Sequence, residues 1–184
     1  DTAVHYRYQR SEQAIGRALA AAVQHGDVQR DEVVLITKGG FVPFEGERPP
    51  EPRKWVYQRF IESGLAHAND FAANYQHCLA PDFLDTMIAT SRRNLGVDTL
   101  DIYLLHTPET QRISNTHTTF RRRMLDAFET LEAAVERGAI GAYGVSTWSA
   151  FRSPPDAPDY LALTELVGLA FQVAGDANHF RYVQ

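Results

Sequence analysis

Four short apolar segments of this 184-residue chain each end in a side chain that can donate a proton or a hydrogen bond: Lys38, His106, Ser146 and Gln184. The clearest is residues 100–106, where five of the six residues before His106 are apolar or aromatic, as in a strand buried on both faces of a parallel sheet. Pro108 follows and cannot continue a central strand, so His106 is expected at the strand's carboxyl end. Ligands bind at that end of parallel α/β sheets, so the four side chains predict a shared site.

The elements that must position these side chains alternate between strand and helix. Helical spacing of apolar residues separates the short strands, and this alternation predicts an α/β fold with a parallel sheet. The strands are expected at residues 33–37, 100–106, 142–145 and 180–183, and the helices from Ser11 as N-cap to Gly26, from Pro81 to Gly96, from Met124 to Gly138, and from Leu163 to near Gly175.

Two stretches lack any periodic pattern. About forty residues after Lys38 contain several prolines and a run of aromatic side chains. A loop of this length is either an active-site lid or a surface insertion that packs on its own aromatic residues. The polar stretch from Glu109 to Thr119 is predicted to be a second loop.

Two architectures suit the strand–helix alternation: a small open sheet, or part of a (β/α)8 barrel, which typically needs about 250 residues. The chain stops on a predicted strand with no helix after it. We therefore expect residues 1–184 to form a single domain, an incomplete parallel-strand portion of a (β/α)8 TIM barrel that is truncated at both ends.

Composition excludes several kinds of partner. The formal charge of −5 argues against nucleic acid or an anionic membrane. The only dense basic cluster, Arg121–Arg123, is interpreted as the solvated face of a helix, and no apolar run approaches the roughly 18 residues of a membrane span. Cys78 is the only cysteine, so no intramolecular disulfide can form and the cytoplasm is the expected compartment.

Motifs around the predicted strand ends resemble those of the aldo/keto reductases, in that family's order. Residues 1–6 (Asp-Thr-Ala-Val-His-Tyr) resemble its DTAxxY motif, and residues 36–38 and 104–106 resemble its strand-end lysine and histidine. Residues 91–101 resemble its SLxxLgxdyiD signature, and residues 138–146 are similar to its GkirxxGvS motif. The resemblance implies an NADPH-dependent oxidoreductase that reduces a small-molecule aldehyde or ketone to an alcohol. NADH stays open as the cofactor, because the loops that bind the cofactor phosphates in this family follow its last two strands, and those strands have no counterpart here. The family's first strand has no counterpart either.

The resemblance implies a catalytic tetrad of Asp1, Tyr6, Lys38 and His106. Hydride transfer to a carbonyl carbon builds negative charge on the oxygen, which needs a proton and preorganised donors. Tyr6 would supply the proton, and although a free tyrosine is a weak acid with a pKa of about 10, a neighbouring ammonium such as that of Lys38 favours the phenolate form. Asp1 would hold the lysine charged and oriented, and His106 would direct the substrate carbonyl.

The resemblance also implies that Ser146 and Gln184 hydrogen-bond the carboxamide of the nicotinamide. Thr147 stands where the family often has asparagine, and its side chain is shorter and offers the cofactor a single hydroxyl group. A Rossmann site is not supported, because no GxGxxG fingerprint is present. No histidine spacing such as HExxH occurs, so no metal is predicted, and His5 and His77 are further candidates to line the substrate pocket.

Two alternatives to the enzyme stay open on the sequence. One is a nicotinamide-binding regulatory module on the same fold, resembling the potassium-channel β subunits, although the presence of all four tetrad residues favours an enzyme. The other is an inactive fragment, because a partial barrel has open strand edges and an uncovered apolar face.

Overall fold

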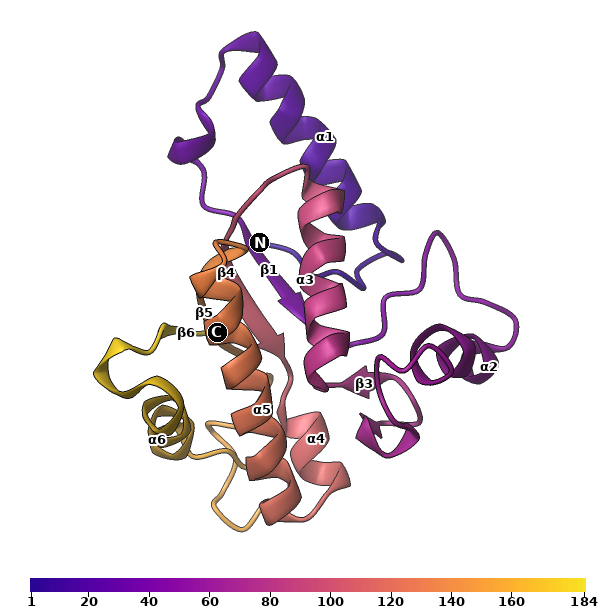
Figure 1. The fold of residues 1–184 in the computed structure, drawn as a ribbon, viewed down its shortest axis with the longest axis vertical. Coiled ribbons are helices and arrows are strands. Elements are labelled where there is room, and N and C mark those ends of the chain that lie inside the picture. Colours follow the sequence, from indigo (N-terminus) through magenta and orange to yellow (C-terminus); the bar gives the residue numbers. More distant parts are fainter.

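The computed structural model describes residues 1–184 and contains a four-stranded parallel sheet, as Figure 1 shows. The strands are β1 (Ile36–Gly39), β4 (Leu100–His106), β5 (Ile140–Ser146) and β6 (Phe180–Val183), and they lie side by side in that order. Each neighbouring pair is parallel. The predicted α/β class with a parallel sheet is therefore confirmed.

Residues 2–4 extend this sheet beyond β1. The amide of Thr2 donates to the carbonyl of Ile36 at 2.9 Å, and the amide of Val4 donates to the carbonyl of Lys38 at 3.1 Å. These two bonds hold the segment against β1. Asp1 directly precedes this segment in the chain, and Tyr6 follows two residues after it.

Helices cover one face of the sheet, and in Figure 1 α3 and α5 lie in front of the strands. α1 contacts α3, α3 contacts α5, and α5 contacts α6. None of the helices is both long and apolar enough to cross a membrane. The four long helices are α1 (Arg10–His25), α3 (Pro81–Leu95), α5 (His117–Glu136) and α6 (Leu163–Ala174).

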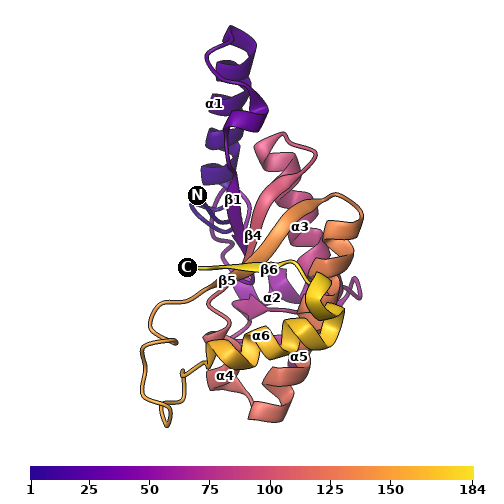
Figure 2. The same ribbon diagram turned by 90° about the vertical axis from the view of Figure 1, so that its left-hand side faces the viewer.

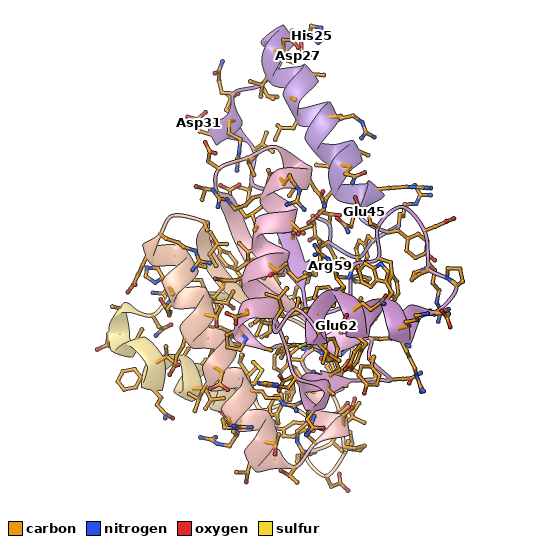
Figure 3. The ribbon with its side chains drawn as sticks, turned by 45° about the vertical axis from the view of Figure 1, so that its right-hand side comes forward. His25, Asp27, Asp31, Glu45, Arg59 and Glu62 are labelled. Carbon is orange, nitrogen blue, oxygen red and sulfur yellow. The ribbon has the colours of Figure 1, made fainter.

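The main hydrophobic core lies between the sheet and these helices. Tyr103 of β4 and Tyr143 of β5 are fully buried there, and Phe128 of α5 packs against Tyr143 with ring centroids 5.4 Å apart. Burying one side chain of this size stabilises the fold by roughly 1.5–3 kcal/mol. The distal end of α1 lies outside this core: only Glu12 and Gly16 of the helix are buried, and Figure 3 shows His25 and Asp27 at the tip that stands clear of the sheet.

Residues 41–80 form an insertion with a small core of its own. Val42, Val56 and Phe60 pack there against Phe83 of α3, and Trp55 contacts Phe60 with ring centroids 5.7 Å apart. The structure thus matches the second expectation for this stretch, an insertion that packs on its own aromatic residues. Figure 3 labels Glu45, Arg59 and Glu62 on its exposed surface. Its elements are the helix α2 (Pro52–Val56), the π-helical turn η2 (Tyr57–Ile61), the 3-10 helix η3 (Ala68–Asp70), and the hairpin of β2 (Phe71–Ala72) with β3 (His77–Cys78).

Strand β6 crosses the line of the other strands at a steep angle in Figure 2. The pairing of β5 with β6 shifts register between Tyr143 and Gly144. Gly144 permits this close approach, because any Cβ there would collide with the carbonyl oxygen of Tyr182. The sheet curls as a result, and Gln184 at the end of β6 comes to face Asp1.

Some element boundaries differ from the sequence-based predictions. β1 begins at Ile36 rather than at residue 33, and Val34 is 63% exposed, because residues 33–35 follow the turn η1 (Arg30–Glu32) before they reach the sheet. α1 begins at Arg10, so Ser11 is not its N-cap; the Ser11 hydroxyl instead bonds that of Thr2 at 2.9 Å.

The polar stretch from Glu109 to Thr119 is not a loop, which corrects the prediction. It contains the short helix α4 (Glu109–Ser114) and the first turn of α5, where Thr116 is the N-cap and its hydroxyl accepts from the amide of Thr119. The prediction failed because α4 is polar and has no apolar periodicity. The helix α6 ends at Ala174 with Gly175 as its C-cap, close to the predicted end near Gly175, and Gly175 begins the short helix η4 (Gly175–Ala177).

Candidate active site

A cavity of about 230 Å³ lies at the carboxyl ends of the strands. All seven residues that the sequence singled out line it, and so do Thr107 and Trp148, which the sequence reasoning missed although each directly follows a predicted residue. A larger cavity between α1 and α3 lies at the amino ends of β1 and β4, away from these side chains. The seven predicted residues are Asp1, Tyr6, Lys38, His106, Ser146, Thr147 and Gln184.

The ammonium group of Lys38 is buried and held by two acceptors. Its Nζ donates to Asp1 Oδ1 at 2.7 Å and to the carbonyl oxygen of Thr2 at 2.9 Å, while the lysine side chain is only 3% exposed. The same Nζ lies 5.7 Å from the centroid of the Tyr6 ring. Burial lowers the pKa of Lys38 to about 8, so the group is still charged at pH 7 but loses its proton more readily than a free lysine.

Behind Lys38, a buried carboxylate ties β1 to the helices. Thr37 donates its hydroxyl proton to Glu12 Oε1 at 2.6 Å, and Asn94 of α3 donates to Glu12 Oε2 at 2.9 Å. Burial raises the pKa of Glu12. Because Thr37 precedes Lys38 in the strand, this network fixes the end of β1 from which the lysine projects.

The rings of Tyr6 and His106 are in edge-to-face contact at the wall of the cavity. Their ring centroids are 5.8 Å apart with an edge-to-face angle of 76°, and Tyr6 is 38% exposed. The ring of His5 packs against both, at 4.8 Å from Tyr6 and 5.0 Å from His106. Lys38, Tyr6 and His106 therefore form one cluster, in which Tyr6 and His106 are the members that a small carbonyl group in the cavity could meet.

The imidazole of His106 is neutral at pH 7. Burial, together with the nearby His5, Lys38 and His77, lowers its pKa to about 3. Its Nδ1 is buried and has no hydrogen-bond partner, which favours a proton on Nε2, because a buried N–H without an acceptor is rarer than an unpaired acceptor. His106 can thus donate a hydrogen bond from Nε2 without carrying charge.

The residues that directly follow Tyr6 and His106 in the chain have left-handed backbone conformations. Arg7, Tyr8 and Gln9, directly after Tyr6, have φ angles of 51°, 58° and 71°, and Thr107, directly after His106, has a φ angle of 46°. Such conformations cost a non-glycine residue roughly 1–2 kcal/mol each, and they concentrate at functional sites. Gln9 anchors the first turn by donating from Nε2 to the carbonyl of Pro43 at 3.0 Å.

The side chains of Ser146 and Gln184 form the other wall of the cavity. Ser146 Oγ donates to Gln184 Oε1 at 3.0 Å, and Gln184 Nε2 donates to Asp1 Oδ2 at 3.1 Å. A carboxamide carries one carbonyl acceptor and two N–H donors, so a hydroxyl and an amide side by side are a matching set of partners. The residues present therefore fit a nicotinamide carboxamide.

The two additional histidine candidates occupy different places. His5 contacts the rings of Tyr6 and His106, and burial with the neighbouring Lys38 lowers its pKa to about 4. His77 is fully buried and does not line the cavity; it binds the main chain of His106. No group of three or more histidine, cysteine, aspartate or glutamate side chains is placed to hold a metal ion.

Comparison with known proteins identifies relatives of one kind. The model of the aldo/keto reductase family matches residues 1–153. A D-threo-aldose 1-dehydrogenase from Pseudomonas sp is 30% identical over 151 residues, which are 80% of this chain and 39% of that protein. The chain thus spans well under half the length of this relative.

Two solved structures share the fold at low sequence identity. One is the aldo-keto reductase AKR11C1 from Bacillus halodurans in its holo form, with a TM-score of 0.50 and 22% identity over 80% of this chain and 35% of that one. The other is the Bombyx mori aldo-keto reductase AKR2E4 in complex with NADP, with a TM-score of 0.52 and 22% identity over 91% of this chain and 38% of that one. The curled sheet described above corresponds to part of these barrels.

Proposed function

Since the chain belongs to the aldo/keto reductase family, we propose that it carries the catalytic part of an NADPH-dependent reductase that converts an aldehyde or ketone to an alcohol. The observation that carries this proposal is the position of Lys38. Its buried ammonium is hydrogen-bonded by Asp1 and lies over the ring of Tyr6, and the ring of His106 packs edge-to-face with the same tyrosine.

Each residue of this cluster has a defined task in the proposed reaction. NADPH, when bound, supplies the hydride that the carbonyl carbon accepts. As the C=O π bond breaks, the oxygen takes the phenolic proton of Tyr6, and His106 orients that oxygen by donating from Nε2. The Lys38 ammonium stabilises the phenolate left on Tyr6, and Asp1 keeps the ammonium in place.

Ser146 and Gln184 are proposed to bind the nicotinamide carboxamide, and Thr147 adds a hydroxyl beside them. In the structure Gln184 already bridges Ser146 and Asp1, so its amide is oriented toward the cavity before a ligand arrives. Preorganised partners of this kind reduce the entropy lost on binding. Selection of NADPH rather than NADH is a proposal based on the family.

The same groups can run the reaction in the opposite direction. Tyr6 as phenolate would then accept the proton of a substrate hydroxyl, which is the chemistry expected of a dehydrogenase. The relative from Pseudomonas sp carries the name of a sugar dehydrogenase, so aldoses are reasonable substrates to assay in both directions. The single buried Cys78 suits a reducing compartment, and we propose a cytoplasmic location on that basis.

The test is the substitution Tyr6→Phe in the full protein, with NADPH consumption measured against a reactive aromatic aldehyde. We expect kcat to fall by about 10²–10⁴-fold, the usual contribution of a general acid. Tyr8→Phe is a matched control, because Tyr8 has the same 38% exposure but does not line the cavity, and it should keep wild-type turnover. Unchanged turnover in Tyr6→Phe would remove Tyr6 as the proton donor.

Slow turnover of the wild-type protein, together with very tight retention of NADPH, would instead favour the nicotinamide-binding regulatory module. A broad and uncooperative thermal transition would favour the inactive fragment, since a closed core melts cooperatively.

A further inference from the structure

His77, at the start of β3, lies buried beneath the strand end that carries His106. Its Nε2 is 2.8 Å from the carbonyl oxygen of His106. Gly40 packs at this contact with a φ angle of 135°, and a Cβ there would lie 2.8 Å from His77 Nε2 and 3.1 Å from the same carbonyl oxygen. The absence of a side chain at residue 40 therefore leaves the space in which the two histidines meet.

Gln111 of α4 fixes the protonation of His77. Its Oε1 accepts from Arg123 of α5 and from Asn115, so its amide nitrogen must be the atom that faces His77, 3.0 Å from Nδ1. An amide nitrogen can only donate, hence Nδ1 accepts and the imidazole proton sits on Nε2. Burial lowers the pKa of His77 to about 4, so the ring is neutral and donates from Nε2 to His106.

Arg123 is the last residue of the basic cluster Arg121–Arg123, for which the sequence predicted a solvated helix face. One of its guanidinium nitrogens donates to Gln111 and another donates to the carbonyl oxygen of Asn69 in the insertion. Successive hydrogen bonds therefore run from Arg123 of α5 to Gln111 of α4, from Gln111 to His77 in the insertion, and from His77 to the carbonyl oxygen of His106.

The peptide group between His106 and Thr107 is held at both of its polar atoms. Its oxygen accepts from His77, and its N–H donates to the carbonyl oxygen of Ser146 at 2.6 Å. Thr107 has a φ angle of 46°, a region that β-branched residues rarely occupy. Such a conformation persists only where surrounding contacts over-determine it, and these two hydrogen bonds do so.

We infer that His77 is a positioning residue for His106: by binding the His106 carbonyl oxygen it fixes the peptide plane from which the His106 ring reaches the substrate. The inference rests on the proposed role of His106 in carbonyl reduction. A rotation of this peptide plane would move the ring, and a misplacement of about 1 Å at a reacting group can lower the rate about 100-fold.

The test compares two amides at residue 77. In His77→Gln the side-chain amide nitrogen reaches the position of the imidazole Nε2 and can still donate to the His106 oxygen, whereas in His77→Asn it is too short to do so. We expect His77→Asn to lower kcat by roughly 10–100-fold with the Kd for NADPH unchanged, and His77→Gln to restore kcat to within about threefold of wild type. Loss of stability alone would reduce the amount of folded enzyme in both variants and would not separate Gln from Asn.

A second measurement does not depend on turnover. Nitrogen-15 NMR of the imidazoles should show His77 neutral with its proton on Nε2 at pH 7, and His77→Asn should change the His106 ring shifts and speed hydrogen exchange at the Thr107 amide, while His77→Gln should not. Wild-type kcat and unaltered His106 shifts in His77→Asn would overturn the inference. A wild-type protein that reduces no aldehyde would overturn the proposed function, and the NMR comparison would still decide whether His77 positions His106.

Discussion

Gln184 Nε2 donates a hydrogen bond of 3.1 Å to Asp1 Oδ2, although 183 residues separate the two in the sequence. The other oxygen of the same carboxylate, Oδ1, accepts from Lys38 Nζ at 2.7 Å. One carboxylate thus joins the proposed nicotinamide contact to the proposed catalytic lysine. A change at Asp1 should be felt in cofactor binding and in proton transfer together.

Asp1→Asn should lower kcat by about 10–100-fold and weaken NADPH binding. The buried Lys38 ammonium loses its counter-charge in this variant, so the alkaline limb of the pH–kcat profile should move to lower pH by about one unit. Asp27→Asn is the control, since Asp27 is exposed at the far end of α1 (Figure 3). An unmoved alkaline limb in Asp1→Asn would contradict the pairing of Asp1 with Lys38.

The proposed carbonyl reduction by the wild-type protein should slow as the pH rises through about 8. Burial lowers the pKa of Lys38 to about 8, so the ammonium that stabilises the Tyr6 phenolate becomes neutral above that pH. The measurement is kcat for carbonyl reduction between pH 6 and pH 10. Lys38→Arg keeps its charge over this range and should retain a low but pH-independent rate, and an alkaline limb that persists there would assign the titration to another group.

Stability should fall as the pH decreases from about 6.5 toward 4. In the unfolded chain a histidine binds its proton near pH 6.5, whereas burial lowers the pKa of His5 and His77 to about 4 and that of His106 to about 3. The unfolded state therefore binds more protons in this window, and protonation favours unfolding. For His77 alone, the free energy of unfolding should fall by about 3 kcal/mol once the pH is below both pKa values. The free energy of unfolding of His77→Gln, measured in urea, should therefore depend less on pH than that of wild type.

Ser146→Ala should raise the Kd for NADPH by about 5–10-fold, the equivalent of one ordinary hydrogen bond. The substitution removes the hydroxyl that donates to Gln184 and leaves the strand backbone intact. Fluorescence titration of the purified protein measures the effect. Ser149→Ala, an exposed serine in the following turn, should bind NADPH like wild type, and equal Kd values for the two variants would exclude Ser146 from the cofactor site.

Glu132→Ala should destabilise the fold by about 2–4 kcal/mol without changing the pH dependence of kcat. Glu132 Oε1 accepts from the Tyr143 hydroxyl at 2.8 Å and from the His179 amide at 2.7 Å, so its loss leaves a buried hydroxyl and a half-buried amide without this acceptor and loosens β6 from α5. Glu136→Ala on the exposed side of α5 is the control. A difference in urea midpoint between the two variants measures the contribution of the buried network.

Much of the site was predictable from the sequence because each predicted strand ends in a polar side chain and the strands are parallel. That pattern brought Lys38, His106, Ser146 and Gln184 to one cavity, as the structure shows. The motif resemblance added Asp1 and Tyr6, which lie beside the sheet on a segment too short to be read as a strand. Boundaries were less predictable: the apolar Val34 was counted in a strand, yet it is exposed before the sheet begins.

The contacts behind the cavity were not predictable in the same way. His77 lies in a stretch without periodicity, and nothing local indicates that it meets a carbonyl 29 residues further along the chain. Gln111 lies on a polar helix of six residues that gives no amphipathic signal. Both positions depend on long-range packing of the insertion against α4 and α5.

The hydrogen bond from His77 to the main chain of His106 also limits how the insertion can be exchanged. Loops beyond the ends of barrel strands are natural targets for grafting when substrate preference is to be altered. A graft that replaced residues 41–78 with a shorter loop would delete the donor that holds the His106 peptide, even if every cavity-lining residue were kept. Any transplanted loop must therefore carry a buried donor at the equivalent of His77, and a glycine at residue 40 to make room for it.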